Sequence, residues 1–134
     1  MPAHTLLILL VIFSLLYLTS SSTLRFNEKG EFTILQLTDL HFCNPRWDET
    51  PADTIAKDEK TKAIQRNALR IVKPDLVVFS GDAISAYKGA LKEGEFEKCW
   101  ERATEAVVEA GIPWAYILGN HEEGGYLEPK QIVR

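Results

Sequence analysis

The stretch that decides the fold of this chain is Phe32-Thr33-Ile34-Leu35-Gln36-Leu37-Thr38-Asp39-Leu40-His41, an apolar run that ends in two potential metal ligands. The same pattern occurs twice more, as Leu76-Val77-Val78-Phe79 before Gly81-Asp82 and as Trp114-Ala115-Tyr116-Ile117-Leu118 before Gly119-Asn120-His121-Glu122. Short, continuous apolar runs are typical of strands buried in a parallel sheet. Because such sheets place their ligand sites at the carboxyl ends of strands, we expect the three motifs to converge in one crevice.

Two helix-like segments separate the apolar runs. The first follows a loop at residues 44–51 and continues to about Val72, where Pro74 stops it. The second lies between a loop at residues 85–93 and Gly111. The resulting β-α-β-α-β order predicts an α/β fold whose connections are long enough for right-handed parallel crossovers.

Side-chain patterns within these segments predict what is buried. Two apolar stripes are expected to define the inner helix faces: Ile64, Ala68, Ile71 and Val72 on the first helix, and Phe96, Trp100, Ala103, Val107 and Ala110 on the second. Trp100 and Trp114 are expected to be structural, whereas Trp47 suits either packing or substrate contact. The charged run at residues 57–60 is expected to be a solvated helix face.

The N-terminus indicates export. Residues 6–18 form an uncharged apolar stretch, shorter than the roughly 20 residues of a membrane-spanning helix, and small Ser and Thr residues follow it. We therefore expect a signal peptide at residues 1–22, a domain at residues 23–134 and secretion or another extracytoplasmic location without a stable membrane span. The alternative is an uncleaved N-terminal anchor, since the first five residues lack Lys and Arg.

Charge and cysteine content narrow the function classes. The net charge of −4 belongs wholly to the part after residue 22, and this mild acidity argues against nucleic-acid binding. About 112 residues remain after the signal, enough for one small core. Cys43 and Cys99 allow one disulfide, but their spacing does not decide whether they pair.

The motifs together form an inventory of metal ligands with oxygen and nitrogen donors and no thiolate: Asp39 and Asp82, the amide of Asn120, and His41 and His121. If the first strand continues, Asp39 and His41 would face the same side. Taken singly, each carboxylate could instead cap the following helix, and each histidine could be structural. Only the joint arrangement favours a metal site.

In this order and spacing, the D-x-H, G-D and G-N-H-E motifs resemble the calcineurin-like metallophosphoesterase family over about residues 32–122. The resemblance implies a metal-dependent phosphoester hydrolase, phosphomonoesterase-like, with two metal ions that would be Fe, Mn or Zn. It implies that Asp39, His41 and Asp82 bind the first ion. Asp82 then bridges to a second ion bound by Asn120. His121 is implied to be catalytic in the outer shell, with Glu122 in a supporting, orienting role.

Three local matches point to one branch of the family, the purple acid phosphatase relatives near the Dcr2-type phosphatases: residues 35–41, 73–79 and 112–115. One departure matters. Purple acid phosphatases usually have a tyrosine three residues after the Asp of their G-D motif, and here that position is Ser85. A purple iron centre is therefore not expected, and a colourless dimetal centre stays open.

The resemblance also predicts what is missing. The family completes its site with later histidines, whereas this chain has only His4, His41 and His121. The expected fold is thus the N-terminal β-α-β-α-β half of a metallophosphoesterase α/β sandwich, with one sheet face left for a missing C-terminal half or a partner. The alternative function is a non-catalytic secreted half-domain or pseudo-enzyme that binds a partner or a single metal weakly; the 134 residues alone are expected to be inactive.

Overall fold

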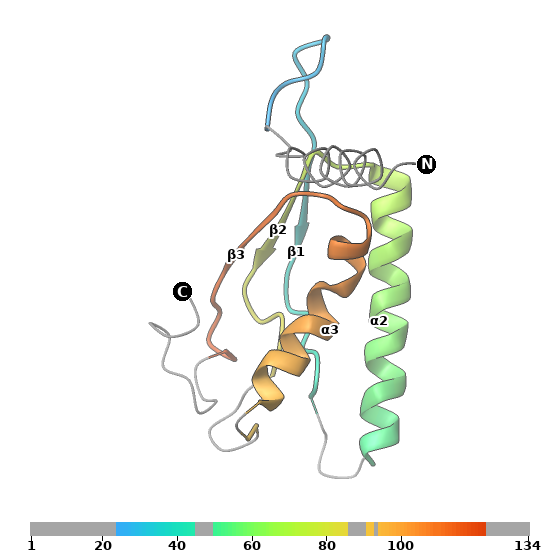
Figure 1. Ribbon diagram of the computed structural model, residues 1–134, viewed down its shortest axis with the longest axis vertical. Coiled ribbons are helices and arrows are strands. Elements are labelled where there is room, and N and C mark those ends of the chain that lie inside the picture. The colour runs from blue at the N-terminus through green and yellow to red at the C-terminus, as the bar shows by residue number, and fades with distance from the viewer. Residues whose placement is uncertain (1–23, 45–49, 86–90, 93, 123–134) are drawn as a thin grey trace, which may run out of the picture.

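The computed structural model describes residues 24–44, 50–85, 91–92 and 94–122. Its elements are, in chain order, β1 (Ile34–Leu37), α2 (Pro51–Val72), β2 (Leu76–Ser80), α3 (Glu95–Glu109) and β3 (Trp114–Ile117). The strands pair in parallel in the order β1-β2-β3, as Figure 1 shows. The β-α-β-α-β prediction is confirmed, with the first and third strands shorter than expected.

Local signals in the sequence set both ends of α2. Thr50 is its N-cap and forms a capping box with Asp53, while Pro51 occupies the first turn, where its missing N–H costs nothing. Lys73 ends the helix in the left-handed conformation and donates its N–H to the carbonyl of Leu69 at 2.9 Å. Pro74 then prevents continuation, as predicted.

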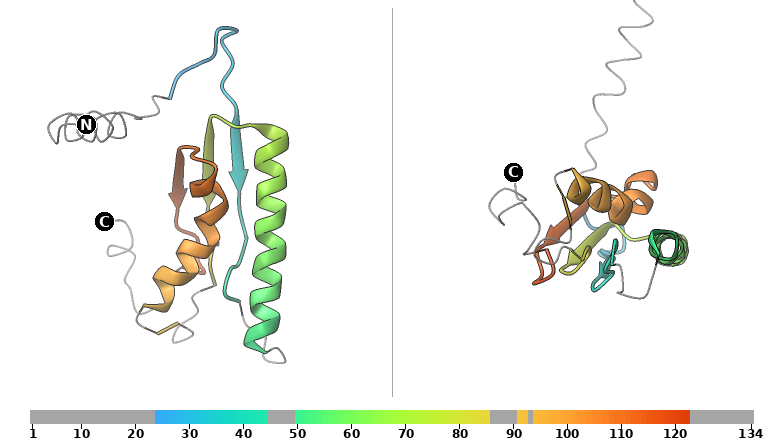
Figure 2. Two further views of the ribbon diagram at one scale, coloured as in Figure 1. Left: turned by 45° about the vertical axis from the view of Figure 1, so that its right-hand side comes forward. Right: turned by 90° about the horizontal axis from the view of Figure 1, so that it is seen from below.

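One face of the sheet packs against α3 and carries the core. In Figure 2, α3 covers this face and α2 lies beside β1. Val77 and Phe79 of β2 are buried there, and Val107 of α3 is fully buried. The prediction that Trp100 and Trp114 are structural is confirmed, since their ring centroids lie 6.1 Å apart between α3 and β3.

The opposite face of the sheet carries no other described element. Alternation along the strands places Ile34 and Ile117 on this face, and they are 55% and 65% exposed. On the same face the Nε2 group of Gln36 donates to Oγ of Ser80 at 2.8 Å, so the face also carries one polar pair. We call this surface the open face of the sheet.

The predicted apolar stripe of α2 does not face the core. Ile64 and Ile71 are 69% and 70% exposed, and Val72 is 40% exposed. The buried residues lie on a different side of the helix and are mostly polar: Thr54, Asp58, Lys62, Gln65 and Leu69. The sequence interpretation was therefore wrong about this face, and the expectation of a solvated run at residues 57–60 was wrong for Asp58.

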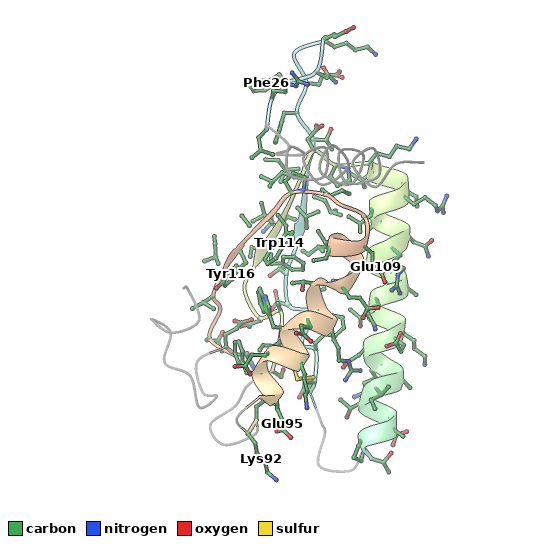
Figure 3. The ribbon with its side chains drawn as sticks, in the orientation of Figure 1. Phe26, Lys92, Glu95, Glu109, Trp114 and Tyr116 are labelled. Carbon is green, nitrogen blue, oxygen red and sulfur yellow. A yellow bond between two sulfur atoms is a disulfide. The ribbon has the colours of Figure 1, made fainter. Side chains whose placement is uncertain are left out.

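Charge pairing between α2 and α3 explains why α2 buries a mostly polar face. Nζ of Lys62 lies 2.8 Å from Glu105, and the guanidinium of Arg66 contacts Glu105 and Glu109 at 3.0 and 2.9 Å. Figure 3 shows Glu109 on the side of α3 that faces α2. Buried charges are tolerated only when they are paired and hydrogen-bonded, and here each helix supplies the charge that the other one needs.

Candidate metal centre

The segment after β1 departs from strand geometry at alternate residues. Asp39, His41 and Cys43 have φ values of 54°, 50° and 56°, in the left-handed region. Each such residue costs about 1–3 kcal/mol and persists only where surrounding contacts hold it. The strand therefore does not continue to these residues, because it ends at Leu37, but their side chains still approach each other, with Oδ1 of Asp39 3.9 Å from Nε2 of His41.

Backbone hydrogen bonds to the loop after β2 hold this unusual segment in place. The N–H of Asp39 donates to the carbonyl of Gly81 at 3.1 Å, and that of His41 donates to the carbonyl of Asp82 at 2.9 Å. Phe42, fully buried, donates to Ala83 at 3.0 Å. The first two motifs are thus joined through their backbones.

Two glycines bring the second and third motifs into contact. A Cβ on Gly81 would lie 3.0 Å from the Cα of Gly119, and a Cβ on Gly119 would overlap the carboxylate of Asp82. Any side chain at either position would therefore force the two loops apart. Gly81 also has a φ of 106°, which L-residues rarely adopt.

Glu122 ties the same two loops together from the inside. Its side chain is 1% exposed and accepts three backbone N–H groups: those of Gly119 at 2.7 Å, Asp82 at 3.1 Å and Ile84 at 3.3 Å. Three donors satisfy a carboxylate that is buried in this way. Burial, followed by the nearby charge of Glu122, also raises the pKa of Tyr116 on β3.

The three motifs converge on one small group of side chains. His41, Asp82 and His121 each offer a ligand atom, and these atoms all lie within 4.8 Å of one another. The two imidazole centroids are 4.6 Å apart with their planes 79° apart. Oδ1 of Asp82 accepts the backbone N–H of His121 at 2.9 Å, so the carboxylate and the second histidine are fixed to each other.

The other two predicted ligands are more exposed than the members of this group. The Asp39 side chain is 63% exposed, and its Oδ1 lies 3.9 Å from Nε2 of His41. Its Oδ2 accepts a hydrogen bond from Oγ1 of Thr38 at 2.6 Å. Asn120 is exposed and precedes His121 at the end of the β3 segment. Their roles as ligands stay predictions.

Ser85 supports His41 in a way that the sequence did not reveal. The serine is 1% exposed, and its Oγ lies 3.0 Å from Nδ1 of His41. Metal-binding histidines usually donate their second ring N–H to such a partner, which leaves the other nitrogen free for the metal. The sequence marked this position only as a replacement for tyrosine.

The donor set fits a divalent ion. Two imidazole nitrogens and one carboxylate oxygen suit ions such as Zn²⁺ or Fe²⁺, and three protein ligands leave a position open for water or substrate. Cys43 supplies no thiolate, because the structure pairs it with Cys99, 56 residues away, at a Cα–Cα distance of 5.9 Å. Spacing alone had left this pairing open.

A buried ion pair supports the same loop from α2. The Asp58 carboxylate is 3.3 Å from the backbone N of Cys43 and 2.9 Å from the guanidinium of Arg102 on α3. Burial raises the pKa of Asp58, and the charge of Arg102 opposes that rise. The signal that could have found this residue is its spacing, four residues after Thr54 and four before Lys62.

Within the described residues, neither helix offers a segment with the length and apolarity that crossing a bilayer requires. The long helix α2 carries charges throughout its 22 residues.

Comparison with known proteins gives a family match. A family model described as calcineurin-like phosphoesterase matches residues 32–133. The chain is 36% identical over 108 residues, 75% of its length, to "Probable inactive purple acid phosphatase 14" of Arabidopsis thaliana. It is also 36% identical over 118 residues, 85% of its length, to "Phosphatase DCR2" of Saccharomyces cerevisiae.

A third relative, "Probable inactive purple acid phosphatase 29" of Arabidopsis thaliana, is 33% identical over 119 residues, 82% of this chain. The matches cover 25%, 20% and 28% of these three relatives respectively. The chain therefore spans about a quarter of the length of the curated relatives it matches.

Proposed function

Because this chain belongs to the calcineurin-like phosphoesterase family, we propose that it contributes the first part of a metal-dependent centre for phosphoester hydrolysis. The observation that carries the proposal is the convergence of His41, Asp82 and His121 at the ends of three parallel strands. Nitrogen and oxygen donors in that arrangement are suited to a divalent ion next to a phosphoester. A phosphomonoester is the proposed substrate class, supported by the relative named as a phosphatase.

The residues of this chain have different roles in the proposed centre. A bound metal supplies positive charge for the phosphoryl oxygens and lowers the pKa of water. Glu122 and Gly119 keep the loop that carries Asp82 in contact with the loop that carries His121. Ser85 orients His41, and in the complete two-metal site His121 donates a proton to the leaving alkoxide.

The complete centre needs ligands beyond these residues. Asp82 and Asn120 alone give a second ion two oxygen donors, which are too few to compete with water. We therefore propose that hydrolysis requires the later histidines of the family and that further strands cover the open face, where Ile34 and Ile117 are exposed.

A second candidate function is a half-domain without catalysis that holds one metal or a partner. The open face favours it, because an exposed apolar sheet surface is a place for another polypeptide. The names of two relatives, which include the word inactive, are consistent with this candidate.

The proposed location is extracytoplasmic. The apolar stretch at residues 6–18 supports it, and so does the Cys43–Cys99 disulfide, since disulfides persist in oxidising compartments. The measurement is fractionation of cells that express the tagged chain, followed by thiol labelling with and without reductant. Recovery in the cytosol with two free thiols would refute this location.

The test of hydrolysis starts by sequencing the native transcript beyond the codon for Arg134. The protein of native length is then assayed for hydrolysis of p-nitrophenyl phosphate with Zn²⁺, Mn²⁺ and Fe²⁺. Asp82→Asn is expected to lower kcat/KM at least about 100-fold, whereas Glu101→Gln, an exposed site on α3, should leave it unchanged. Absence of hydrolysis by the native-length protein with every metal would favour the second candidate.

A further inference from the structure

We propose that the Cys43–Cys99 disulfide is a thiol-exchange site, and that its reduction by a small uncharged thiol loosens the loop that carries His41. The metal centre is then assembled in the oxidised protein and weakened in the reduced one. This inference rests on the proposed function only in placing a divalent ion at His41, since the thiol chemistry and the movement of the loop are measured without that ion.

A cavity opens onto the disulfide, which Figure 3 draws in yellow near the N-terminal end of α3. The cavity has a volume of about 400 Å³, and both cysteines line it together with Pro51, Ile55 and Leu91. Charged side chains of both signs complete the lining, so the cavity does not favour a strongly charged thiol. Its size is in the range that small organic molecules occupy in proteins. We call this cavity the disulfide cleft.

Exposure indicates which sulfur is attacked. Cys99 is 5% exposed and belongs to the apolar core, whereas Cys43 is half-buried at the edge of that core. An external thiolate therefore attacks Sγ of Cys43, the S–S bond breaks, and Cys99 leaves as a thiolate that takes up a proton. A second thiol then displaces the first from Cys43. The protein gains two electrons and two protons, and the two external thiols become one disulfide.

The disulfide restrains the far end of the site loop, residues 39–43. Cys43 has a φ of 56°, a left-handed conformation that persists only where surrounding contacts hold it. The bond to Cys99 is one such contact, and the Asp58 carboxylate, 3.3 Å from the backbone N of Cys43, is another. Because His41 lies two residues before Cys43, loss of the disulfide leaves its imidazole on a loop with a weaker anchor.

The helix at the other end of the disulfide has anchors of its own. Cys99 packs in one core cluster with Phe96 and Ala103 of α3, and Val107 of the same helix is fully buried against the sheet. These apolar contacts do not depend on the S–S bond. Reduction is therefore expected to release the site loop while α3 stays in place.

The first test asks whether the cleft admits a thiol to the folded protein. The protein of native length is incubated with dithiothreitol, and alkylation followed by mass spectrometry gives the reduction rate at Cys43 and Cys99. Ile55→Trp adds a larger side chain to the lining of the cleft and is expected to slow reduction at least about tenfold, since exchange requires access to the sulfur. Ile64→Trp, at an exposed site on α2 outside the cleft, is the matched control and should leave the rate unchanged.

The second test compares the site loop in the oxidised protein, in the reduced protein and in the double variant Cys43→Ser with Cys99→Ser. Amide hydrogen exchange at His41 and Phe42 is expected to be at least about tenfold faster in the last two, whereas exchange in β2 should change much less. The affinity for Mn²⁺ should fall at least about tenfold. Mn²⁺ is the probe because released thiolates prefer softer ions.

Three results would overturn the proposal. One is reduction of the cysteines no faster than global unfolding, with unfolding rates measured in urea and extrapolated to water. Another is an equal reduction rate in Ile55→Trp and the parent. The third is unchanged exchange at His41, unchanged Mn²⁺ affinity, or an equal acceleration throughout β2 in the reduced protein. Hydrolysis by the oxidised protein together with any of these results would leave the proposed function standing, whereas absence of hydrolysis leaves these three measurements fully decisive.

Discussion

The two helices join the rest of the molecule by different forces. α3 buries an apolar face against the sheet, through residues such as Ala106 and Val107, and a disulfide from Cys99 attaches it to the site loop. α2 buries a mostly polar face, and its Lys62 and Asp58 pair with charges on α3. The apolar periodicity of a helix therefore identifies its buried face when its neighbour is an apolar sheet, and fails when its neighbour is a charged helix.

The largest expected effect concerns the covalent attachment of α3. Replacing both cysteines, Cys43→Ser with Cys99→Ser, should lower the free energy of unfolding by about 4 kcal/mol, because the disulfide closes a loop across a sequence separation of 56. Urea denaturation of the variant and of the parent, each with and without dithiothreitol, measures this change in the free energy of unfolding. Equal stability of the oxidised parent and the variant would contradict the role given to this bond.

The next effect separates the two sides of α2. Leu69→Ala should cost about 3 kcal/mol, because Leu69 is 6% exposed and packs in the core, whereas Ile64→Ala should change stability by less than about 0.5 kcal/mol, because Ile64 is 69% exposed. Urea denaturation of both variants measures the difference. Similar losses would show that the stripe predicted from sequence is buried after all.

A smaller effect is expected at the ion pair of Asp58. Arg102→Met should cost about 2 kcal/mol at pH 7, since it leaves a buried carboxylate unpaired and the arginine itself is only 27% exposed. Burial raises the pKa of Asp58 above 3.8 and loss of Arg102 should raise that pKa further, so the folded state binds more protons than the unfolded state. The free energy of unfolding of Arg102→Met should therefore fall as the pH rises through the raised pKa of Asp58.

Urea denaturation at pH 4 and pH 7 checks the sign, and the loss in Arg102→Met should be larger at pH 7. Adding Asp58→Asn to that variant removes the buried charge and should recover most of the loss at pH 7. A loss that does not depend on pH, or no recovery in the double variant, would assign the effect to packing.

The smallest effect is expected at the helix–helix charge network. Lys62→Met should cost about 1 kcal/mol, since its partners Glu59 and Glu105 are 53% and 37% exposed and regain water. The hydrogen bond and charge of Lys62 lower the pKa of Glu105 below 4.5, so the stability this pair supplies is present above that pH and lost as the pH falls.

The Lys62→Met variant should therefore lose less stability than the parent when the pH is lowered from about 5 to 3. Lys60→Met, at an exposed site on the same helix, is the control and should follow the parent. Parallel acid profiles for Lys62→Met and the parent would show that the network contributes nothing measurable.

Much of the fold could be predicted from the chain alone. Short apolar runs, Pro74 after the first helix and Gly111 after the second are local signals, and they gave the element order and the parallel sheet. The same runs placed the motifs at strand ends, and the structure brings His41, Asp82 and His121 together there. These features depend on residues close in sequence or on the general geometry of parallel sheets.

Other features depend on contacts between segments about 40 residues apart. The left-handed backbone at Asp39 and His41 exists because the loop after β2 accepts their N–H groups. The three N–H donors to Glu122 come from two loops, and Ser85 meets His41 across 44 residues. No periodicity or spacing within one segment contains this information.

The sequence by itself determined the order of the elements, the motifs at the strand ends and the family. Only the tertiary structure decided which side of α2 is buried, how Cys43 and Cys99 pair, and which potential ligands form one group. The physical reason is that hydrophobic periodicity and turn signals act between near neighbours, whereas the cost of burying a charge or straining a backbone depends on partners that folding brings from elsewhere in the chain.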